Sequence, residues 1–482
     1  MKNRLPINIR LNRWLVFVGL FGAIAGLLIL ASHASSPYAS LEPEQGNATQ
    51  VLTGNSVATS GQKFVEFGTH ISGSTYYIDC NGSDTNNGTA PATAWKSLAK
   101  ANTATLAVGD GIAFKRGCTF NGSLNIKWAG VAIISYGSGA QPLFQSAVNN
   151  TNIINVTGSN NIIDGLNVAA LAPSTDPACS NNAVGHVVDF YLANGATGNT
   201  IKNSIASGAY AGVFIASGAT NNHVTNNQIV NNTMMSPLDN INNNNDAGAF
   251  GVLLWGDNND ISYNQINGSD ACSYDYGRDG SAVEVFNGSN NSIHHNKASN
   301  DIAFTELGKD ISHTSTGNTY AYNLYTYTNS SQGIFLNIHG KANTNLGPVT
   351  DTKAYDNDVY ITASSGPGAV VCNGCGTDIL TLRNNIIWDN VKGLWTDVAF
   401  NESNNIFWSA SGIPIIQGIT IDSTSKKVDP KFVVSGSDFH LQASSPAIDA
   451  GSIESVNSGF NRDLDNNAVP LNAIVDVGAY EY

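Results

Sequence analysis

Short apolar strands alternate with Gly/Asn-rich turns through the middle of this chain, and this repeat limits the fold more than any other feature. The segments GVFIASGATNNHVTNNQIVNN from Gly212 and GVLLWGDNNDISYNQINGSD from Gly251 share an apolar strand, a Gly/Asn turn, a second alternating strand and an Asn-rich exit. The same order returns in AVEVFNGSNNSIHHNKASND from Ala282 and AVVCNGCGTDILTLRNNIIWDN from Ala369. No helical segment separates the strands, which argues against βαβ units. The pattern is typical of the coils of a β-solenoid, in which stacking buries one face of each coil against its neighbours.

Asparagines recur at one position of these coils. Asn227, Asn264 and Asn296 match in position from coil to coil. In a stack of coils such amides lie above one another and bond to the turn backbones. We therefore predict a structural asparagine ladder at these positions.

The composition limits the partners of the protein. Only 12% of residues are charged, while 42% are hydrophobic, which is enough to fill a core. The formal net charge is −14, and no local basic patch is visible, so a nucleic-acid partner is disfavoured.

The N-terminus indicates the compartment. Basic residues precede an uncharged run from Trp14 to Leu30, and the small residues Ser32 and Ala34 fit a cleavage site. We interpret residues 1–34 as a signal peptide, with an uncleaved N-terminal anchor as the alternative. The protein is then secreted or at the cell surface, touches a membrane only through that segment, and is expected to be a monomer.

The remaining chain divides into a linker and one domain. Residues 35–72 are Ser/Thr/Gly-rich without periodicity, which predicts a flexible linker. Residues 73–482 form the expected solenoid domain, including a C-terminal segment at 428–482. Near its start, TYYID predicts a strand, and Thr93 is expected to cap a short helix that buries Trp95 and Leu98.

Six cysteines, an even number, suit an oxidising compartment. Cys80 with Cys118 would staple the first ordered segment, and Cys372 with Cys375 would close a small loop. A zinc site requires a second ligand pair at matching spacing, and a redox CxxC requires a βαβ context. The sequence shows neither a second ligand pair nor a βαβ context. We therefore predict that these cysteines form a structural disulfide or are inert thiols.

Two segments carry a family resemblance. YYIDCNGSDTNNGTAPATAWKSLAKAN with GDGIAFKRGCTFNGSL resembles the N-terminal cap and first turn of secreted right-handed parallel β-helix proteins of the pectate-lyase-like superfamily. LQASSPAIDAG and VDVGAYEY are similar to the C-terminal segment of many such proteins. The resemblance implies an all-β, single-stranded right-handed parallel β-helix with a short N-terminal capping helix. It implies no single activity, because the superfamily contains polysaccharide lyases, glycoside hydrolases, epimerases and non-catalytic surface proteins.

Two glutamates stand inside predicted strands, 22 residues apart. Strand alternation places Val283 and Val285 inward and Glu284 outward. Because 22 residues is a plausible coil, Glu306 is expected beside Glu284 on the next strand, at a strand spacing of about 4.8 Å. Two carboxylates that close do not ionise together, so the pKa of one should rise. An acid beside a base or nucleophile is the arrangement that glycoside hydrolysis requires.

Long loops on both sides of this face predict a groove. Asp279 is a third carboxylate, and it is the alternative to either glutamate. The resemblance implies that substrate lies along this face. Other expected substrate contacts are Arg278, Lys309, Trp255, Phe286, Tyr274, Tyr276, His295 and His339.

Three functions remain open. The leading one is a polysaccharide-degrading glycoside hydrolase that uses Glu284, Glu306 and Asp279 and needs no metal or other cofactor. The second is a lyase, in which Lys309 or Lys297 abstracts a proton, Arg278 binds a uronate and the glutamates hold Ca²⁺. The third is a non-catalytic glycan-binding surface solenoid, in which the glutamates belong to an idle sheet face.

Overall fold

The computed structural model describes residues 52–55, 63–66, 71–171, 185–236, 244–410 and 415–482. The chain forms two units, Met1–His70 and Ile71–Tyr482. In the first unit, strand β1 (Leu52–Asn55) pairs antiparallel with β2 (Lys63–Glu66), within the segment expected to be a linker. The predicted signal peptide or anchor lies outside the described residues. In the described part of the chain, no helix is both long and apolar enough to span a bilayer.

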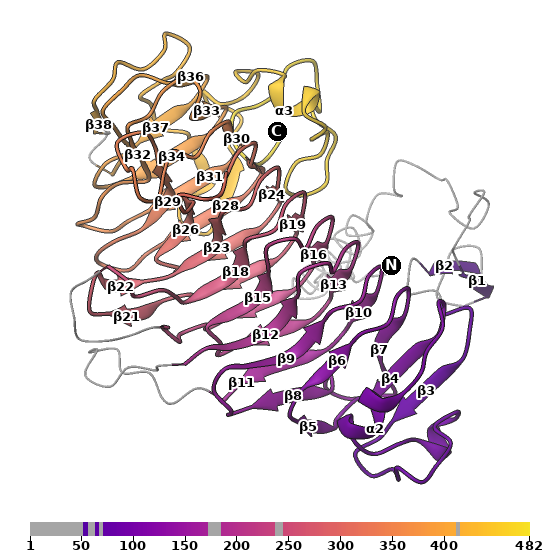
Figure 1. Ribbon diagram of the computed structural model, residues 1–482. Coiled ribbons are helices and arrows are strands. Elements are labelled where there is room, and N and C mark those ends of the chain that lie inside the picture. The colour runs from indigo at the N-terminus through magenta and orange to yellow at the C-terminus, as the bar shows by residue number, and fades with distance from the viewer. Residues whose placement is uncertain (1–51, 56–62, 67–70, 172–184, 237–243, 411–414) are drawn as a thin grey trace, which may run out of the picture. The chain divides into compact units, whose positions relative to one another are not determined.

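The second unit is built from three long parallel sheets, and each full coil contributes one strand to each sheet. Figure 1 shows the coils stacked in chain order. Sheet 1 has 12 strands. In order these are β3 (Thr75–Ile78), β4 (Gly111–Lys115), β7 (Ala132–Tyr136), β10 (Ile162–Asp164), β13 (Thr200–Lys202), β16 (His223–Thr225), β19 (Asp260–Ser262), β24 (Ser292–His294), β27 (Thr319–Ala321), β30 (Thr352–Tyr355), β33 (Leu380–Arg383) and β36 (Asn401–Ser403).

Sheets 2 and 3 have 11 strands each. Sheet 2 contains β5 (Thr119–Asn121), β8 (Leu143–Ser146), β11 (Asn167–Ala170), β14 (Ile205–Ser207), β17 (Gln228–Val230), β20 (Gln265–Asn267), β25 (Lys297–Ser299), β28 (Leu324–Tyr327), β31 (Asp358–Ile361), β34 (Ile386–Asp389) and β37 (Ile406–Trp408). Sheet 3 contains β6 (Leu124–Ile126), β9 (Thr151–Val156), β12 (Val187–Leu192), β15 (Ala211–Ile215), β18 (Phe250–Leu254), β23 (Ser281–Phe286), β26 (Ala303–Gly308), β29 (Ile334–His339), β32 (Val370–Asn373), β35 (Leu394–Thr396) and β38 (Ile416–Gln417).

The core is a set of apolar rows that run through the stack. In sheet 1, one row pairs Ile163 with Ile201, then Val224, Ile261 and Ile293, all almost completely buried. Each inward side chain therefore packs on its equivalents in the coils above and below. This arrangement explains how short strands with few residues each bury a continuous core.

The predicted asparagine ladder is confirmed. The Asn227 side chain donates to Oδ1 of Asn264 at 3.0 Å, and Asn264 donates to Oδ1 of Asn296 at 3.0 Å. This ladder continues to Asn405, and a second one runs from Asn161 to Asn318 in another turn. The ladder amides also bond to turn backbone groups, such as the Val224 carbonyl.

The predicted second strand of each coil is in fact two strands. In the coil from Gly212, β16 and β17 are separated by Asn226, whose φ of 56° turns the chain from sheet 1 to sheet 2. Tyr263 and His295 take the same left-handed conformation at the equivalent turns. Asparagine tolerates this region, but alternation alone does not mark the bend.

The N-terminal cap contains the 3₁₀ turn η2 (Pro91–Thr93) and helix α2 (Leu98–Thr103). The expectation that Thr93 caps the helix is wrong. The N-cap is Ser97, whose hydroxyl accepts the Lys100 N–H at 3.1 Å, because η2 and an extended Trp95 come first. Trp95 and Leu98 are buried as expected.

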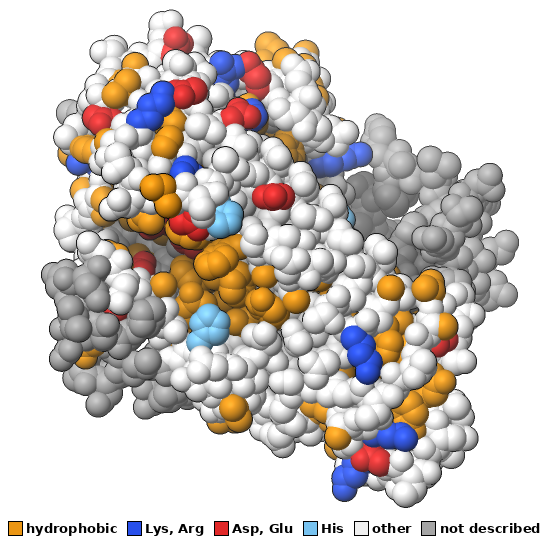
Figure 2. Space-filling model, viewed as in Figure 1, with side chains coloured by type: hydrophobic (Ala, Val, Ile, Leu, Met, Phe, Trp, Pro, Cys, Tyr) orange, Lys and Arg blue, Asp and Glu red, His pale blue; other side chains and the backbone are white. Residues whose placement is uncertain are grey.

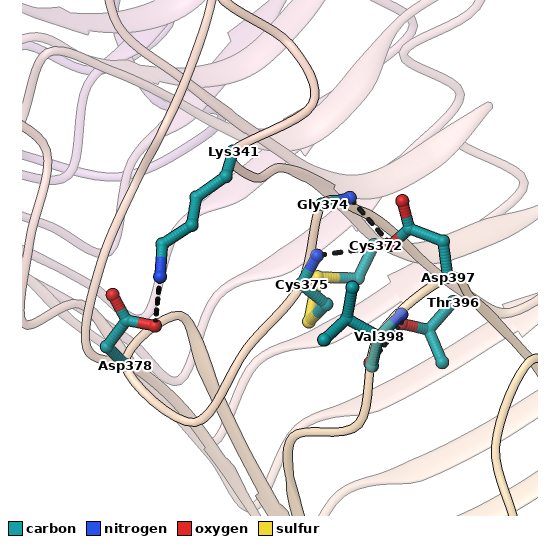
Figure 3. The surroundings of a disulfide bond; sticks show 8 residues. All are labelled: Lys341, Cys372, Gly374, Cys375, Asp378, Thr396, Asp397 and Val398. Carbon is teal, nitrogen blue, oxygen red and sulfur yellow. Dashed lines mark hydrogen bonds and ion pairs between the residues drawn. A yellow bond between two sulfur atoms is a disulfide. The ribbon is translucent and has the colours of Figure 1, made fainter.

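Both predicted disulfides are present, Cys80 with Cys118 and Cys372 with Cys375. The second fastens the turn after β32, where the N–H groups of Gly374 and Cys375 both donate to Asp397 on the following coil (Figure 3). The CxxC pair is therefore part of the coil-to-coil packing.

The C-terminal residues cover part of the solenoid. They include β39 (Phe432–Val434), its antiparallel partner β40 (Asp438–Leu441) and the short helix α3 (Glu454–Asn457). The Ser455 hydroxyl bonds to the Tyr322 hydroxyl at 3.2 Å, at a turn between sheets 1 and 2. Phe432 and Phe439 pack against Ile386 and Ile406 of sheet 2.

Candidate active site

The outer face of sheet 3 carries Glu284 and Glu306 in the predicted register. Val285 pairs with Leu307, so Glu284 and Glu306 lie next to each other on β23 and β26. Their inward neighbours Val283, Val285, Thr305 and Leu307 are essentially inaccessible to solvent. Both glutamates therefore project from the solenoid, on strands about 4.8 Å apart.

Two side chains of the next coil hold Glu306. His339 Nε2 lies 2.7 Å from Oε1, and the Asn337 amide donates to Oε2 at 3.0 Å. Asn343 in turn bonds to His339 Nδ1 at 2.8 Å and orients the ring. Burial raises the pKa of Glu306, but the hydrogen bond and attraction of His339, with the amide of Asn337, hold the pKa below its ordinary value. Glu306 is thus the ionised member of the pair.

Glu284 has the opposite environment. Its side chain is buried, and Ser281, three residues earlier on the same strand, donates to Oε2 at 2.7 Å. Burial, followed by the negative charges of Glu306 and Asp279, raises the pKa of Glu284 well above its ordinary value. Glu284 therefore keeps its proton near neutral pH.

Asp279 comes from a hairpin at the side of the pair. Strands β21 (Ala271–Ser273) and β22 (Gly277–Asp279) are antiparallel, and Ala271 pairs with Asp279. Asp246 anchors the hairpin turn by accepting the Ser273 hydroxyl and the Tyr274 N–H at 2.8 and 2.7 Å. Burial, and then the charge of Glu306, raises the pKa of Asp279 to about 8. Asp279 is a second carboxyl that is protonated near neutral pH.

The hairpin formed by β21 and β22 also carries two tyrosines close to the carboxyl groups in sequence. Tyr274 and Tyr276 are both exposed. Burial, and then the charges of Asp279, Asp275 and Glu306, raises the pKa of Tyr276 to about 12. Tyr276 therefore lies in the electrostatic field of the carboxyl groups and carries a neutral hydroxyl.

Aromatic side chains continue the same face toward the N-terminal coils. The ring centroids of Tyr191 and Phe214 are 5.4 Å apart, those of Phe214 and Trp255 5.4 Å, and those of Trp255 and Phe286 5.7 Å. Trp255 and Phe286 are thus neighbours, and Phe286 lies on β23, the strand that carries Glu284. Figure 2 shows apolar side chains gathered over the strands labelled β12, β15 and β18, with acidic and histidine side chains beside them.

The basic residues proposed as contacts do not pair with the glutamates. The Arg278 Nε lies 2.6 Å from Asp270 Oδ1. The Lys309 ammonium donates to the Asp310 carbonyl at 3.1 Å. Between described residues, no ion pair joins a lysine or arginine to Glu284, Glu306 or Asp279.

Two predicted residues lie on other surfaces. Lys297 belongs to β25 of sheet 2, and its ammonium lies 5.8 Å from the Tyr480 ring centroid. His295 was expected to contact substrate, but it is buried in the turn between sheets 1 and 2 and bonds to the Arg462 carbonyl at 3.0 Å. Burial, together with His294, lowers the pKa of His295 to about 4. Alternation did not reveal this turn, because the bend at His295 reverses the direction of the following side chains.

Sequence reasoning missed Asn337 and Ser281. Asn337 pairs in register with Glu306, 31 residues later, and the longer coil hid this correspondence. The alternation of apolar and polar residues in IFLNIH could have identified it, because this alternation directs Asn337 and His339 outward, to the same face as Glu306. Asn287 and Asp310 were also missed; they exchange hydrogen bonds of 3.0 and 2.8 Å and fix the loop after β26 to the end of β23.

One group of described side chains has the spacing of potential metal ligands. Among described residues, the one group of three potential ligands with mutually close ligand atoms is Asp79, Cys80 and Cys118. Both of those cysteines are engaged in a disulfide. Asp279, Glu284 and Glu306 do not belong to that group.

Comparison with known proteins identifies the fold. No protein-family model matches the chain, and no curated protein matches it. Pectate lyase Pel9A superposes with a TM-score of 0.54 at 17% identity, covering 85% of this chain and 96% of that one. XylC in complex with xylose gives 0.50 at 9% identity, covering 84% and 98%.

A lacto-N-biosidase of family GH136 from Eubacterium ramulus matches with a TM-score of 0.48 at 12% identity, over 73% of this chain. The matched region spans 66% of the length of that enzyme. The three continuous parallel sheets and the likeness to Pel9A along almost its entire length agree. The chain is a right-handed parallel β-helix protein.

Proposed function

We propose that this protein is a secreted or cell-surface glycoside hydrolase that cleaves polysaccharide on the outer face of sheet 3. The observation that carries the proposal is the pairing of a buried, protonated Glu284 with an ionised Glu306 on the adjacent strand. A carboxylic acid beside a carboxylate is the minimal equipment for glycosidic bond cleavage. The fold neighbours include a pectate lyase and a protein solved with xylose, which supports a glycan as the substrate class.

In the proposed reaction, Glu284 gives its proton to the glycosidic oxygen as the bond to the anomeric carbon breaks. Glu306 attacks that carbon and forms a glycosyl ester. His339 and Asn337 each occupy one lone pair of the carboxylate, so further lone pairs remain for the attack. Water then cleaves the ester and gives its proton to Glu284, which restores both groups.

Strand geometry favours retention of the anomeric configuration. Adjacent strands lie about 4.8 Å apart, close to the carboxyl separation of roughly 5–5.5 Å in retaining enzymes. If Asp279 is the acid instead and its carboxyl group is roughly 6.5–9.5 Å from that of Glu306, there is space for water, and Glu306 activates that water with inversion. The carboxyl groups themselves supply acid and base, so the proposed reaction requires no metal or other cofactor.

A lyase is the second candidate function, for two reasons. A proton-abstracting lysine and a uronate-binding arginine are its requirements, but Lys297 lies on sheet 2 and Arg278 is bound by Asp270. Lys309 is the remaining candidate base.

The test is a screen of the purified protein on neutral and acidic polysaccharides, with Glu284→Gln and Glu306→Gln beside the native chain. Each substitution should lower kcat by about 10²- to 10⁴-fold. Glu454→Gln, on α3, is the matched control and should retain activity. New reducing ends without an ultraviolet-absorbing unsaturated product support the proposal, and proton NMR of the first product reports retention or inversion.

Other results would overturn it. An unsaturated uronate product would identify a lyase. Glycan binding that both Gln variants preserve, with no cleavage of any polysaccharide, would identify a non-catalytic solenoid.

A further inference from the structure

A row of apolar, mostly aromatic side chains lies beside the carboxyl pair, and the cleavage chemistry does not use it. Tyr191, Phe214 and Leu253 occupy successive register positions on β12, β15 and β18, and the next position is Glu284. Phe286 ends β23 two residues after Glu284, and Trp255 directly follows β18, two residues after Leu253. We define these five side chains, four aromatic rings and Leu253, as the aromatic platform. Phe214 and Leu253 are buried, Tyr191 and Phe286 are partly exposed and Trp255 is exposed.

Trp255 is the most informative member of the platform. Its indole remains 37% exposed, although rings of Phe214 and Phe286 lie on either side at 5.4 and 5.7 Å. Its neighbours therefore brace the ring without covering it. A braced aromatic face in contact with water is suited to stacking on a flat, partly apolar ligand such as the face of a pyranose ring.

The platform is continuous with the candidate active site. Phe286 is the last residue of β23 and follows Glu284 by two positions, so both side chains leave the same face of one strand. From β12 to β23 the platform crosses three strand-to-strand steps, about 14 Å in all. This length exceeds a single sugar ring, so an oligosaccharide could lie on the platform with one end at the carboxyl pair.

The charges near the platform select among glycans. The ionised Glu306 makes this end of the face negative, and between described residues no lysine or arginine forms an ion pair with Asp279, Glu284 or Glu306. Arg278, the nearest arginine in sequence, is bound by Asp270. A polyuronate or sulfated chain would meet repulsion here, whereas a neutral chain would not.

We propose that the aromatic platform is a set of sugar-binding subsites that takes neutral oligosaccharides and excludes polyuronates. This inference rests on the proposed function for the position of the scissile bond. To the proposed function it adds that the substrate is a neutral glycan. It also adds that most of the sugar chain binds over β12, β15 and β18, on the N-terminal side of the carboxyl pair. Trp255 is its central specificity-determining residue.

The test measures binding with turnover suppressed, in the full chain carrying Glu284→Gln, which leaves the negative charge of Glu306 in place. Calorimetric titrations use neutral hexasaccharides of xylose, glucose, mannose and N-acetylglucosamine, and acidic hexamers of galacturonate and guluronate. At least one neutral hexamer should bind and both acidic hexamers should bind at least tenfold more weakly. Adding Trp255→Ala should weaken binding of the neutral hexamer about tenfold.

Trp408→Ala is the matched control, because Trp408 lies half-buried on β37 of sheet 2. It should leave affinity unchanged. Preference for an acidic hexamer, no binding of any neutral hexamer, or full affinity after Trp255→Ala would overturn the inference. Because binding is measured without catalysis, Trp255-dependent binding of a neutral glycan supports the platform even if no hydrolysis is found. Hydrolysis that is independent of Trp255 refutes the platform alone.

Discussion

His339 and Asn337 come from the coil that follows Glu306, so the ionised carboxylate is maintained by coil stacking. Glu284 receives no equivalent donors from its own neighbour on the other side, which is Leu253. The two glutamates are chemically identical, and the difference in pKa arises from what stands beside each of them in the stack. The assignment of acid and base is therefore a property of neighbouring coils.

A histidine substitution tests this assignment. In His339→Ala, Glu306 loses its 2.7 Å partner, so its pKa should rise and the carboxylate should form only at higher pH. The acid limb of the pH profile of kcat/KM should move upward by about one pH unit, while the alkaline limb stays in place. The measurement is kcat/KM from pH 3 to 9 on the substrate found in the screen.

His440→Ala is the control for this substitution, because His440 lies on β40, where Asp438 and Asp465 bind it. It should leave both limbs unchanged. A uniform loss of activity at all pH values in His339→Ala, with no movement of the acid limb, would show that His339 has a merely structural role.

At the scale of the element, the turn between sheets 1 and 2 has a constant design from Asn226 onward, whereas Ser204 follows Asn203 in the preceding coil. A left-handed residue bends the chain, and the next residue is a ladder asparagine, as in Asn226 followed by Asn227. The ladder side chain satisfies backbone groups that the bend leaves without a strand partner. The left-handed position accepts Asn, Tyr, His or Asp, because its side chain points away from the ladder.

Removal of one ladder amide should destabilise the solenoid. Asn264 donates to the Val224 carbonyl and to Asn296, and accepts the backbone and side-chain N–H groups of Asn227. Asn264→Ala leaves these buried groups unpaired, which should cost about 3 kcal/mol of unfolding free energy. Thermal and chemical denaturation, followed by circular dichroism, provide the measurement.

Asn194→Ala offers a matched comparison, since Asn194 is an exposed turn residue. Its unfolding midpoint should stay within experimental error of the native protein. An equal effect of the two substitutions would show that the ladder adds nothing beyond ordinary turn hydrogen bonds.

At the scale of the whole molecule, the C-terminal residues bury carboxyl groups against the solenoid. Asp356 and Asp358 are inaccessible, and burial raises the pKa of each well above its ordinary value. Burial also raises the pKa of Glu481 to about 7. The unfolded chain has the ordinary pKa values of these groups, and the folded protein has the raised ones. At a pH between the ordinary and the raised values, the folded form therefore binds more protons than the unfolded chain.

This proton uptake predicts a pH-dependent stability. The contribution is fully present below the unfolded pKa of about 4, and for Glu481 it is lost as pH rises through about 7. The unfolding midpoint should therefore fall from pH 5 to pH 8, and proteolysis within 428–482 should accelerate. Calorimetry and limited proteolysis at both pH values provide the measurement.

An isosteric variant assigns this effect. Asp358→Asn removes a buried acid beneath Gly478 and should reduce the fall between pH 5 and pH 8. Asp378→Asn alters an exposed carboxylate paired with Lys341 and should leave the slope unchanged. A midpoint that rises over this interval in the native protein would contradict the prediction.

Local patterns in the sequence determined the coil repeat, the asparagine ladder, the outward direction of Glu284 and Glu306 and their one-coil register. These features follow from strand alternation and from residue spacing, which are properties of a few adjacent residues. The same patterns placed His295 on the wrong surface and merged β16 with β17. A single left-handed residue changes the direction of the side chains in the strand that follows it, and the composition of the segment does not reveal where that residue lies.

Only the tertiary structure decided which glutamate keeps its proton. Asn337 and His339 lie 31 and 33 residues after Glu306, and the loops that change the length of each coil set the distance in sequence between stacked positions. The pKa of a carboxyl group depends on burial and on charges within a few ångströms, whatever their separation along the chain. Those neighbours exist only once the coils have stacked.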